Sequence, residues 1–148
     1  MSSARLAAES FLSDLEIPLL IRLGASLVAG FLIGAERESR GKPAGISTHS
    51  FVIGGAAVFA MLSMVLGQGD PGRIAAQIVT GVGFLGAGII LKRDDGGVQN
   101  LTTAASIWFS AAIGMAIGFG LYAIAAAATI FSVVVPRIPH ISKRHQDR

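Results

Sequence analysis

Four long apolar tracts dominate the sequence, and each has the length that a helix needs to cross a lipid bilayer. They are residues 17–35, 51–67, 74–91 and 101–135. A membrane span takes about 20 apolar residues, because the hydrocarbon core is about 30 Å thick. The fourth tract carries no charged residue, and as a single helix it would be roughly 52 Å long at about 1.5 Å per residue. We therefore predict that it folds back at Gly118-Phe119-Gly120, which gives five spans.

Basic residues are unevenly distributed between alternate loops. Lys and Arg in short loops are held on the cytoplasmic side of a membrane, whereas acidic residues have little effect. Nine basic residues stand in one set of alternate segments against two in the other, and Arg22 lies inside the first span. The two are Arg5 and Arg73, and the nine are Arg37, Arg40, Lys42, Lys92, Arg93, Arg137, Lys143, Arg144 and Arg148. We therefore predict that the N-terminus is outside and the C-terminus inside.

The composition is typical of a protein that lies almost wholly in a bilayer. Hydrophobic residues make up 52% and charged residues 14% of the chain, which is more apolar than the globular average. We predict an all-α fold, a polytopic membrane bundle of five transmembrane helices at residues 17–135, with membrane lipids as its surroundings. Residues 1–16 form a leader that either lies as an interfacial helix or frays. Residues 136–148 form a basic cytoplasmic tail that anionic headgroups attract.

Small residues recur at four-residue spacing within the spans. This spacing lets helix backbones approach closely, which favours helix association in lipid. We expect the packing to lie within one chain, and a homodimer or higher oligomer is the alternative. The glycines predicted to serve helix packing are Gly30, Gly34, Gly81, Gly83, Gly86, Gly88, Gly114 and Gly118.

Several binding classes find no support. Residues 81–86 match the dinucleotide-binding GxGxxG pattern, but that motif needs a preceding strand and an acidic residue about twenty positions on, and here it lies within an apolar span. The net charge of +3 is spread over loops where topology accounts for it, so it does not indicate nucleic acid. His49 stands without a second ligand, and the chain has no cysteine, so no metal site is assigned. We expect no cofactor.

Polar residues gather at four span ends that the predicted topology places on the cytoplasmic face. Because polar side chains are costly in a bilayer, they mark either helix contacts or a site. The Glu-Arg-Glu run is either a solvated loop or, at a span end, a desolvated set in which Arg37 or Arg40 pairs with a carboxylate. Thr102 and Thr103 either cap a helix N-terminus or hydrogen-bond across to Glu36 or Glu38. The candidate cluster is Glu36, Arg37, Glu38, Arg40, Thr48, Thr102 and Thr103.

A second polar set lies on the predicted outer side. Arg22 is about one and a half turns into the first span, where it either extends its charge to the surface or pairs with Asp70. Arg73 neighbours Asp70, and Gln77 lies one turn into the third span. The candidate outer set is therefore Arg22, Asp70, Arg73 and Gln77.

Five motifs follow one another in a fixed order along the chain. They are residues 22–38, which end in Gly-Ala-Glu-Arg-Glu, then 44–49, 73–77, 81–88 and 101–108. In order and spacing, over roughly residues 18–135, they resemble the MgtC/SapB family of bacterial inner-membrane proteins. The resemblance implies about five spans with an outside N-terminus and a link with magnesium homeostasis and survival inside host cells. Some members are described as restraining the rotary ATP synthase, which the resemblance makes a possible partner.

The resemblance also assigns residues by motif position. Many members have an arginine where Ser47 stands and a glycine where Asn100 stands, and virulence-associated members carry a soluble domain after the last span that we expect to be absent here. The family's glycine signature falls on Gly81, Gly83, Gly86 and Gly88. Its polar signature falls on Glu36, Arg37, Glu38, Arg40, Thr48, Arg73, Thr102, Thr103 and Trp108.

These patterns together favour a membrane protein without catalysis. No nucleophile, base and acid stand in a plausible constellation, and no His and Glu pair has the spacing of a zinc protease. We predict a binding or regulatory role linked to magnesium limitation, membrane energetics or intracellular survival. The alternative is a small transporter or channel for an ion or small solute. It would work as an oligomer, because the centres of the five spans are nearly free of polar side chains.

Overall fold

The computed structural model describes residues 3–66, 70, 72–92 and 97–138, and these residues are almost all helical. This confirms the expected all-helical fold. Helices are favoured here because a segment in lipid must satisfy its own backbone hydrogen bonds. The described residues form α1 (Ser3–Ser39), α2 (Ile46–Leu66), α3 (Gly72–Ile89), α4 (Leu101–Gly118) and α5 (Tyr122–Val134), followed by a short 3-10 helix, η1 (Val135–Arg137).

The charge-free tract folds back where the sequence predicts. α4 ends at Gly118 and α5 begins at Tyr122. Gly120 has a φ of 77°, which glycine adopts without the clash of a Cβ atom. The amides of residues 119–121 donate to carbonyls in the last turn of α4. The predicted turn is therefore confirmed.

Four of the described helices are long and apolar enough to cross a membrane, judged by length and composition. They are Leu15–Ser39, Ile46–Leu66, Gly72–Ile89 and Leu101–Gly118. The apolar helix Tyr122–Arg137, which joins α5 and η1, is shorter. At about 1.5 Å per residue it measures roughly 24 Å, a few ångströms less than a hydrocarbon core of about 30 Å.

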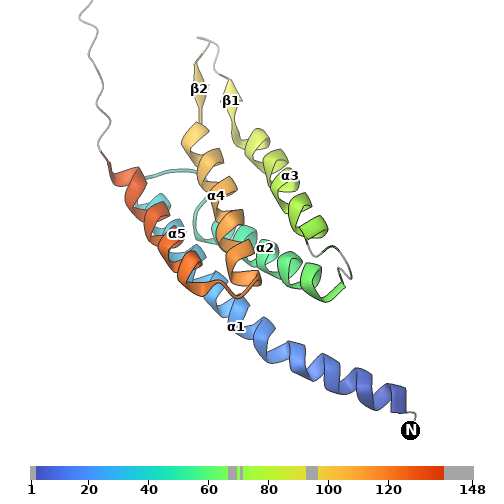
Figure 1. The fold of residues 1–148 in the computed structure, drawn as a ribbon. Helices are drawn as coiled ribbons and strands as arrows, with labels where there is room; N and C mark the ends of the chain where they lie inside the picture. Colours follow the sequence, from blue (N-terminus) through green and yellow to red (C-terminus); the bar gives the residue numbers. More distant parts are fainter. Residues whose placement is uncertain (1–2, 67–69, 71, 93–96, 139–148) are drawn as a thin grey trace, which may run out of the picture.

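α1 is longer than the predicted first span. It runs without a break from Ser3 to Ser39, with Pro18 inside the helix. The boundary predicted after residue 16 is therefore not a break in the backbone. The N-terminal part of α1 projects away from the other helices (Figure 1). At the other end of the chain, residues 139–148 of the predicted tail lie outside the described residues.

α2 is the centre of the bundle, and glycines on α1 and α4 face it. A Cβ atom at Gly30 or Gly34 of α1 would overlap the α2 backbone, and so would a Cβ atom at Gly114 or Gly118 of α4. Both four-residue pairs therefore let a helix approach α2 closely, as small residues do in membrane bundles. The apolar core at this crossing contains Ala29, Ile33, Ile53, Ala57, Ile113, Ile117 and Ala125.

A short β-ribbon joins α3 to α4, and the sequence did not predict it. β1 (Leu91–Lys92) and β2 (Val98–Gln99) pair antiparallel. The ribbon forms between the third and fourth apolar tracts and begins at Leu91, the last residue of the third. There the backbone groups of the reversing chain hydrogen-bond to one another. Figure 1 shows the ribbon, the start of α4 and η1 towards the same end of the bundle, the end at which α1 stops and α2 starts.

Candidate functional site

Arg37 lies in the last turn of α1 and is almost wholly buried, with 1% of its surface exposed. Its Nη2 donates a hydrogen bond of 2.7 Å to Oγ1 of Thr103 in α4. A buried charge is costly unless it is paired or hydrogen-bonded, so this bond ties the end of α1 to the first turn of α4. The solvated-loop interpretation is therefore wrong for Arg37, because α1 continues to Ser39.

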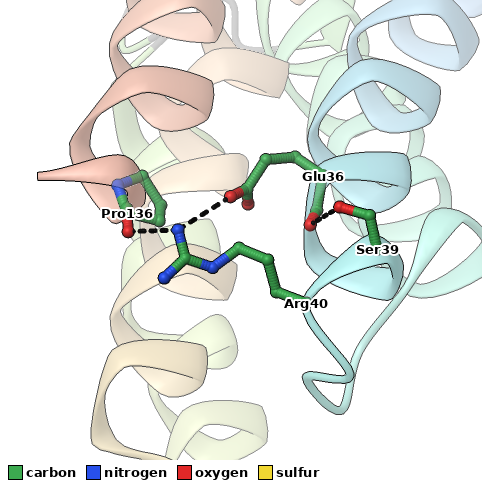
Figure 2. Close-up of polar contacts among 4 residues, drawn as sticks. All are labelled: Glu36, Ser39, Arg40 and Pro136. Carbon is green, nitrogen blue, oxygen red and sulfur yellow. Dashed lines mark hydrogen bonds and ion pairs between the residues drawn. The ribbon is translucent and has the colours of Figure 1, made fainter.

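Glu36 and Arg40 form an ion pair one turn apart at the end of α1 (Figure 2). Arg40 Nη1 lies 3.4 Å from Glu36 Oε1, and the two side chains are 41% and 3% exposed. The same Nη1 donates to the carbonyl oxygen of Pro136 in η1. Arg40 therefore ties the end of α1 to the end of the last helix. The sequence left two interpretations of the Glu-Arg-Glu run open, a solvated loop or an arginine paired with a carboxylate. The position of Arg40 agrees with the second.

Glu38 contacts a third element. Its Oε1 accepts a 2.8 Å hydrogen bond from the backbone amide of Ile46, the first residue of α2. A carboxylate at a helix N-terminus satisfies an otherwise unpaired amide and interacts favourably with the helix dipole. Gly45 leaves room for this contact, since a Cβ atom there would overlap Glu38. We call Glu36, Arg37, Glu38, Arg40, Thr103 and the Pro136 carbonyl the junction.

Two polar atoms of the junction are buried without a hydrogen-bond partner among the residues that the structure describes. They are Glu36 Oε2 and Arg37 Nε. His49 is fully buried in α2, and its Nδ1 lies 2.8 Å from Ser110 Oγ in α4. An unsatisfied buried polar group costs about 1–3 kcal/mol, so such atoms mark places where water or a ligand group completes the contacts.

Two members of the predicted cluster do not join the junction. Thr102 is exposed in the first turn of α4, and Thr48 is half-buried in the first turn of α2. Neither side chain forms a hydrogen bond with the part of the chain that the structure describes. The seven predicted residues therefore divide into a contacting set and two separate threonines.

The N-cap prediction for Thr102 and Thr103 is wrong. The N-cap of α4 is Asn100, which has a left-handed φ of 64° and makes no side-chain cap bond. Its Nδ2 donates to the carbonyl oxygen of Ile89 at 3.3 Å instead. Because the ribbon brings the chain into α4 at Asn100, Thr103 lies inside the first turn and meets Arg37. The predicted hydrogen bond from a threonine hydroxyl to a carboxylate is likewise not formed, because the hydroxyl oxygen of Thr103 accepts from Arg37 instead.

The candidate outer set does not come together. Arg22 Nη1 contacts Met61 Sδ in α2 at 3.4 Å, and Arg22 forms no ion pair with Asp70, although the structure describes both residues. Asp70 is exposed, and its carbonyl accepts from the backbone amide of Arg73 at 3.3 Å. Gln77 is exposed on α3 and lines a groove next to α2. The proposed pairing of Arg22 with Asp70 is wrong because Arg22 packs against α2.

The glycines of α3 differ from those of α1 and α4. A Cβ atom at Gly81, Gly83 or Gly88 would meet nothing within 4 Å among the described residues. Gly86 alone of this group lies at ordinary contact distance from Ala104 of α4. Three of the four are therefore exposed positions where an added methyl group would meet open space, and Gly81 among them lines the groove next to α2.

Sequence reasoning missed two members of this region. Ser110 lies seven residues after Thr103, hence on the same face of α4, and this spacing is a signal that could have paired it with a residue of α2. Pro136 contributes only its carbonyl oxygen, which no side-chain pattern predicts. Trp108 lies apart from the junction, half-exposed in a groove that Thr102 and Pro136 also line. Within the described ranges, no three His, Asp or Glu side chains are grouped to hold a metal ion.

Comparisons with known protein sequences identify relatives of this chain. Protein MgtC of Salmonella typhimurium strain LT2 is 50% identical over 116 residues, which cover 78% of this chain and 50% of the relative. Protein MgtC of Brucella abortus strain 2308 is 48% identical over 114 residues, which cover 76% of this chain and 48% of the relative. The chain thus spans about half the length of the curated relatives it matches. No solved structure matches.

The family model agrees with the resemblance that the motifs carry. Residues 23–143 match the model of the MgtC family. This range contains the whole junction, from Glu36 to Pro136, and four helices that could span a membrane lie in or overlap it. The predicted family is confirmed: the chain belongs to the MgtC family.

Proposed function

We propose that this chain is a multi-pass bacterial inner-membrane protein with a binding or regulatory role, without catalysis, in cells that adapt to magnesium limitation. In this proposal it crosses the membrane five times, with its N-terminus outside and its C-terminus inside. Family membership, four long apolar helices and the distribution of basic residues support it. The relatives are about twice as long, so the proposal concerns the membrane half that they share with this chain.

The observation that carries the proposal is the junction. The buried guanidinium of Arg37 joins the end of α1 to the start of α4 through Thr103. Two exposed charged residues beside it make the other contacts, because Arg40 joins the end of α1 to η1 and Glu38 joins it to the start of α2. A group that competes for Arg40 would release the Pro136 carbonyl. Binding at this end of the bundle would therefore change how the last helix is held, which is what a regulatory contact requires.

Conduction by a single chain has less support than binding. A conducting route needs polar groups across the bilayer, but isoleucines of α1, α2 and α4 fill the centre of the described bundle. The buried hydroxyls of Ser26 and Thr129 donate to carbonyls of their own helices. Partners remain part of the proposal: a second copy on α3, and a membrane complex such as the rotary ATP synthase by family resemblance.

Growth in low-magnesium medium tests the role of the junction. A bacterium without its own MgtC-family protein would express this chain with Arg40→Gln or, as the matched control, Lys42→Gln. Both changes remove one positive charge from the same loop, so both affect topology equally. Arg40 holds Glu36 and Pro136, whereas the Lys42 side chain is exposed. We expect Arg40→Gln to lose the growth advantage at unchanged membrane levels and Lys42→Gln to keep it.

Two results would contradict the proposal. Equal growth of the Arg40→Gln and Lys42→Gln variants would show that the junction has no part in the function. Magnesium flux into liposomes that contain the purified chain would assign the transporter class, since a regulator without a conducting route should give no flux above protein-free liposomes.

A further inference from the structure

A continuous groove runs along the surface between α1 and α5. The part beside the junction is lined by Leu32, Glu36, Val133 and Arg137, among others. The next part extends towards Tyr122 at the start of α5. Leu32, Thr129 and Ile130 line both parts, so the two form one groove that extends the length of the last helix.

Opposite charges line the junction end of this groove. Glu36 Oε1 is held by Arg40, but Glu36 Oε2 is buried without a hydrogen-bond partner in the described part of the chain. Figure 2 shows the Glu36 side chain extending from α1 towards η1, the helix that carries Arg137. Arg137 is exposed, and its guanidinium makes no hydrogen bond or ion pair with the described residues. The groove thus offers a free acceptor and a free cation at one end and an apolar surface beyond them.

The charges lie at the depth of a headgroup. Glu36 is near the end of the candidate span Leu15–Ser39, and Arg137 ends the apolar helix Tyr122–Arg137. One leaflet is about half of a 30 Å core, roughly ten helical residues. Counted back from Arg137, this length reaches the region of Thr129, where the two parts of the groove meet. The stretch of the groove between Arg137 and Thr129 therefore matches the length of an acyl chain in one leaflet.

We propose that this groove binds one phospholipid whose headgroup carries a primary ammonium. The ammonium donates to Glu36 Oε2, the phosphate accepts from Arg137, and an acyl chain lies over Leu32, Ile130 and Val133. Charge complementarity favours this occupant, because an apolar partner helix would leave the buried carboxylate oxygen unsatisfied. A lipid with an uncharged glycerol headgroup still offers its phosphate to Arg137, but its hydroxyls give Glu36 Oε2 only a neutral donor, which makes a weaker hydrogen bond than an ammonium. The inference depends on membrane insertion and not on the proposed regulatory role.

Native mass spectrometry of the delipidated full-length chain tests the site. The protein is titrated with phosphatidylethanolamine or phosphatidylglycerol of identical acyl chains. We expect tighter binding of phosphatidylethanolamine to the unmodified chain. Glu36→Gln should weaken it about tenfold, the effect of one charge-assisted hydrogen bond, and weaken phosphatidylglycerol binding less. Arg137→Gln should weaken both lipids. Glu16→Gln and Arg73→Gln change exposed residues elsewhere and serve as matched controls.

Three outcomes would overturn the proposal. They are equal affinity of the unmodified chain for the two lipids, unchanged phosphatidylethanolamine binding by Glu36→Gln, and a second protein chain that co-purifies and blocks both lipids. If Glu36→Gln does not fold, two other measurements test the proposal. They are the headgroup preference of the unmodified chain and the effect of Arg137→Gln, which changes an exposed residue. Loss of lipid preference with an intact Arg40-dependent growth effect would refute this site alone.

Discussion

Thr103 and Thr102 are adjacent in sequence but differ in their surroundings. Thr103 is buried and accepts from Arg37, whereas Thr102 is exposed on α4. The guanidinium keeps its charge in proteins, so it must be solvated by whatever surrounds it. Within the junction the hydroxyl oxygen of Thr103 supplies part of this solvation, and Arg37 Nε has no hydrogen-bond partner among the described residues. The stability of the bundle should therefore depend on that hydroxyl.

Replacing each threonine by valine tests this dependence. Valine keeps the branched shape and removes the acceptor, so Thr103→Val leaves a buried charge short of a hydrogen bond and should cost about 1–3 kcal/mol. Thr102→Val removes a hydroxyl without a described partner and should have little effect. Apparent unfolding midpoints of the purified variants in the same detergent give the comparison. Matching midpoints would show that the hydroxyl of Thr103 does not support Arg37.

Much of this arrangement follows from the sequence, and the rest depends on partners far apart along the chain. The gathering of Glu36, Arg37, Glu38 and Arg40 at a span end follows from the cost of charge in lipid. The sequence does not indicate which of these side chains is buried, because α1 continues four residues beyond its apolar tract. The contact of Arg40 with a main-chain oxygen in η1 has no pattern in the sequence at all.

The glycines of the helices are of two kinds. Those on α1 and α4 lie against the α2 backbone, whereas at Gly81, Gly83 and Gly88 of α3 an added Cβ atom would meet no described atom within 4 Å. Spacing alone predicts that both kinds serve packing, since it does not say which face of a helix a residue occupies. The difference becomes visible only once the helices are placed around α2. The ribbon between α3 and α4 escaped prediction for a similar reason, because two-residue strands carry no alternation to detect.

Alanine substitution distinguishes the two kinds. In Gly118→Ala the new methyl overlaps the α2 backbone at Ala57, so we expect a loss of about 1–3 kcal/mol. Gly83→Ala meets open space and should be neutral or stabilise α3 by up to about 1 kcal/mol, because alanine favours helix. Detergent unfolding measures both effects. Destabilisation by Gly83→Ala would mean that the exposed face of α3 packs against another chain.

The count of basic residues on the two predicted sides of the membrane changes at one position when the structure is taken into account. Arg37 lies inside α1 and is buried, so the set of nine basic residues contains eight outside that buried position, against two on the other side. Eight against two still predicts opposite sides for the two termini. Reporter fusions to each terminus, with one reporter active only in the cytoplasm and the other only outside it, measure this directly. Activity of the same reporter at both ends would require an even number of crossings.

Arg40 binds the main-chain oxygen of Pro136, an atom that every amino acid carries. A substitution at position 136 therefore leaves the acceptor in place wherever the backbone keeps its path. Comparison of many homologous sequences should accordingly detect no paired changes between positions 40 and 136. Positions 37 and 103 meet through side chains, so paired changes are expected there. Contact prediction from covariation would thus find the bond between Arg37 and Thr103 and overlook the one between Arg40 and η1.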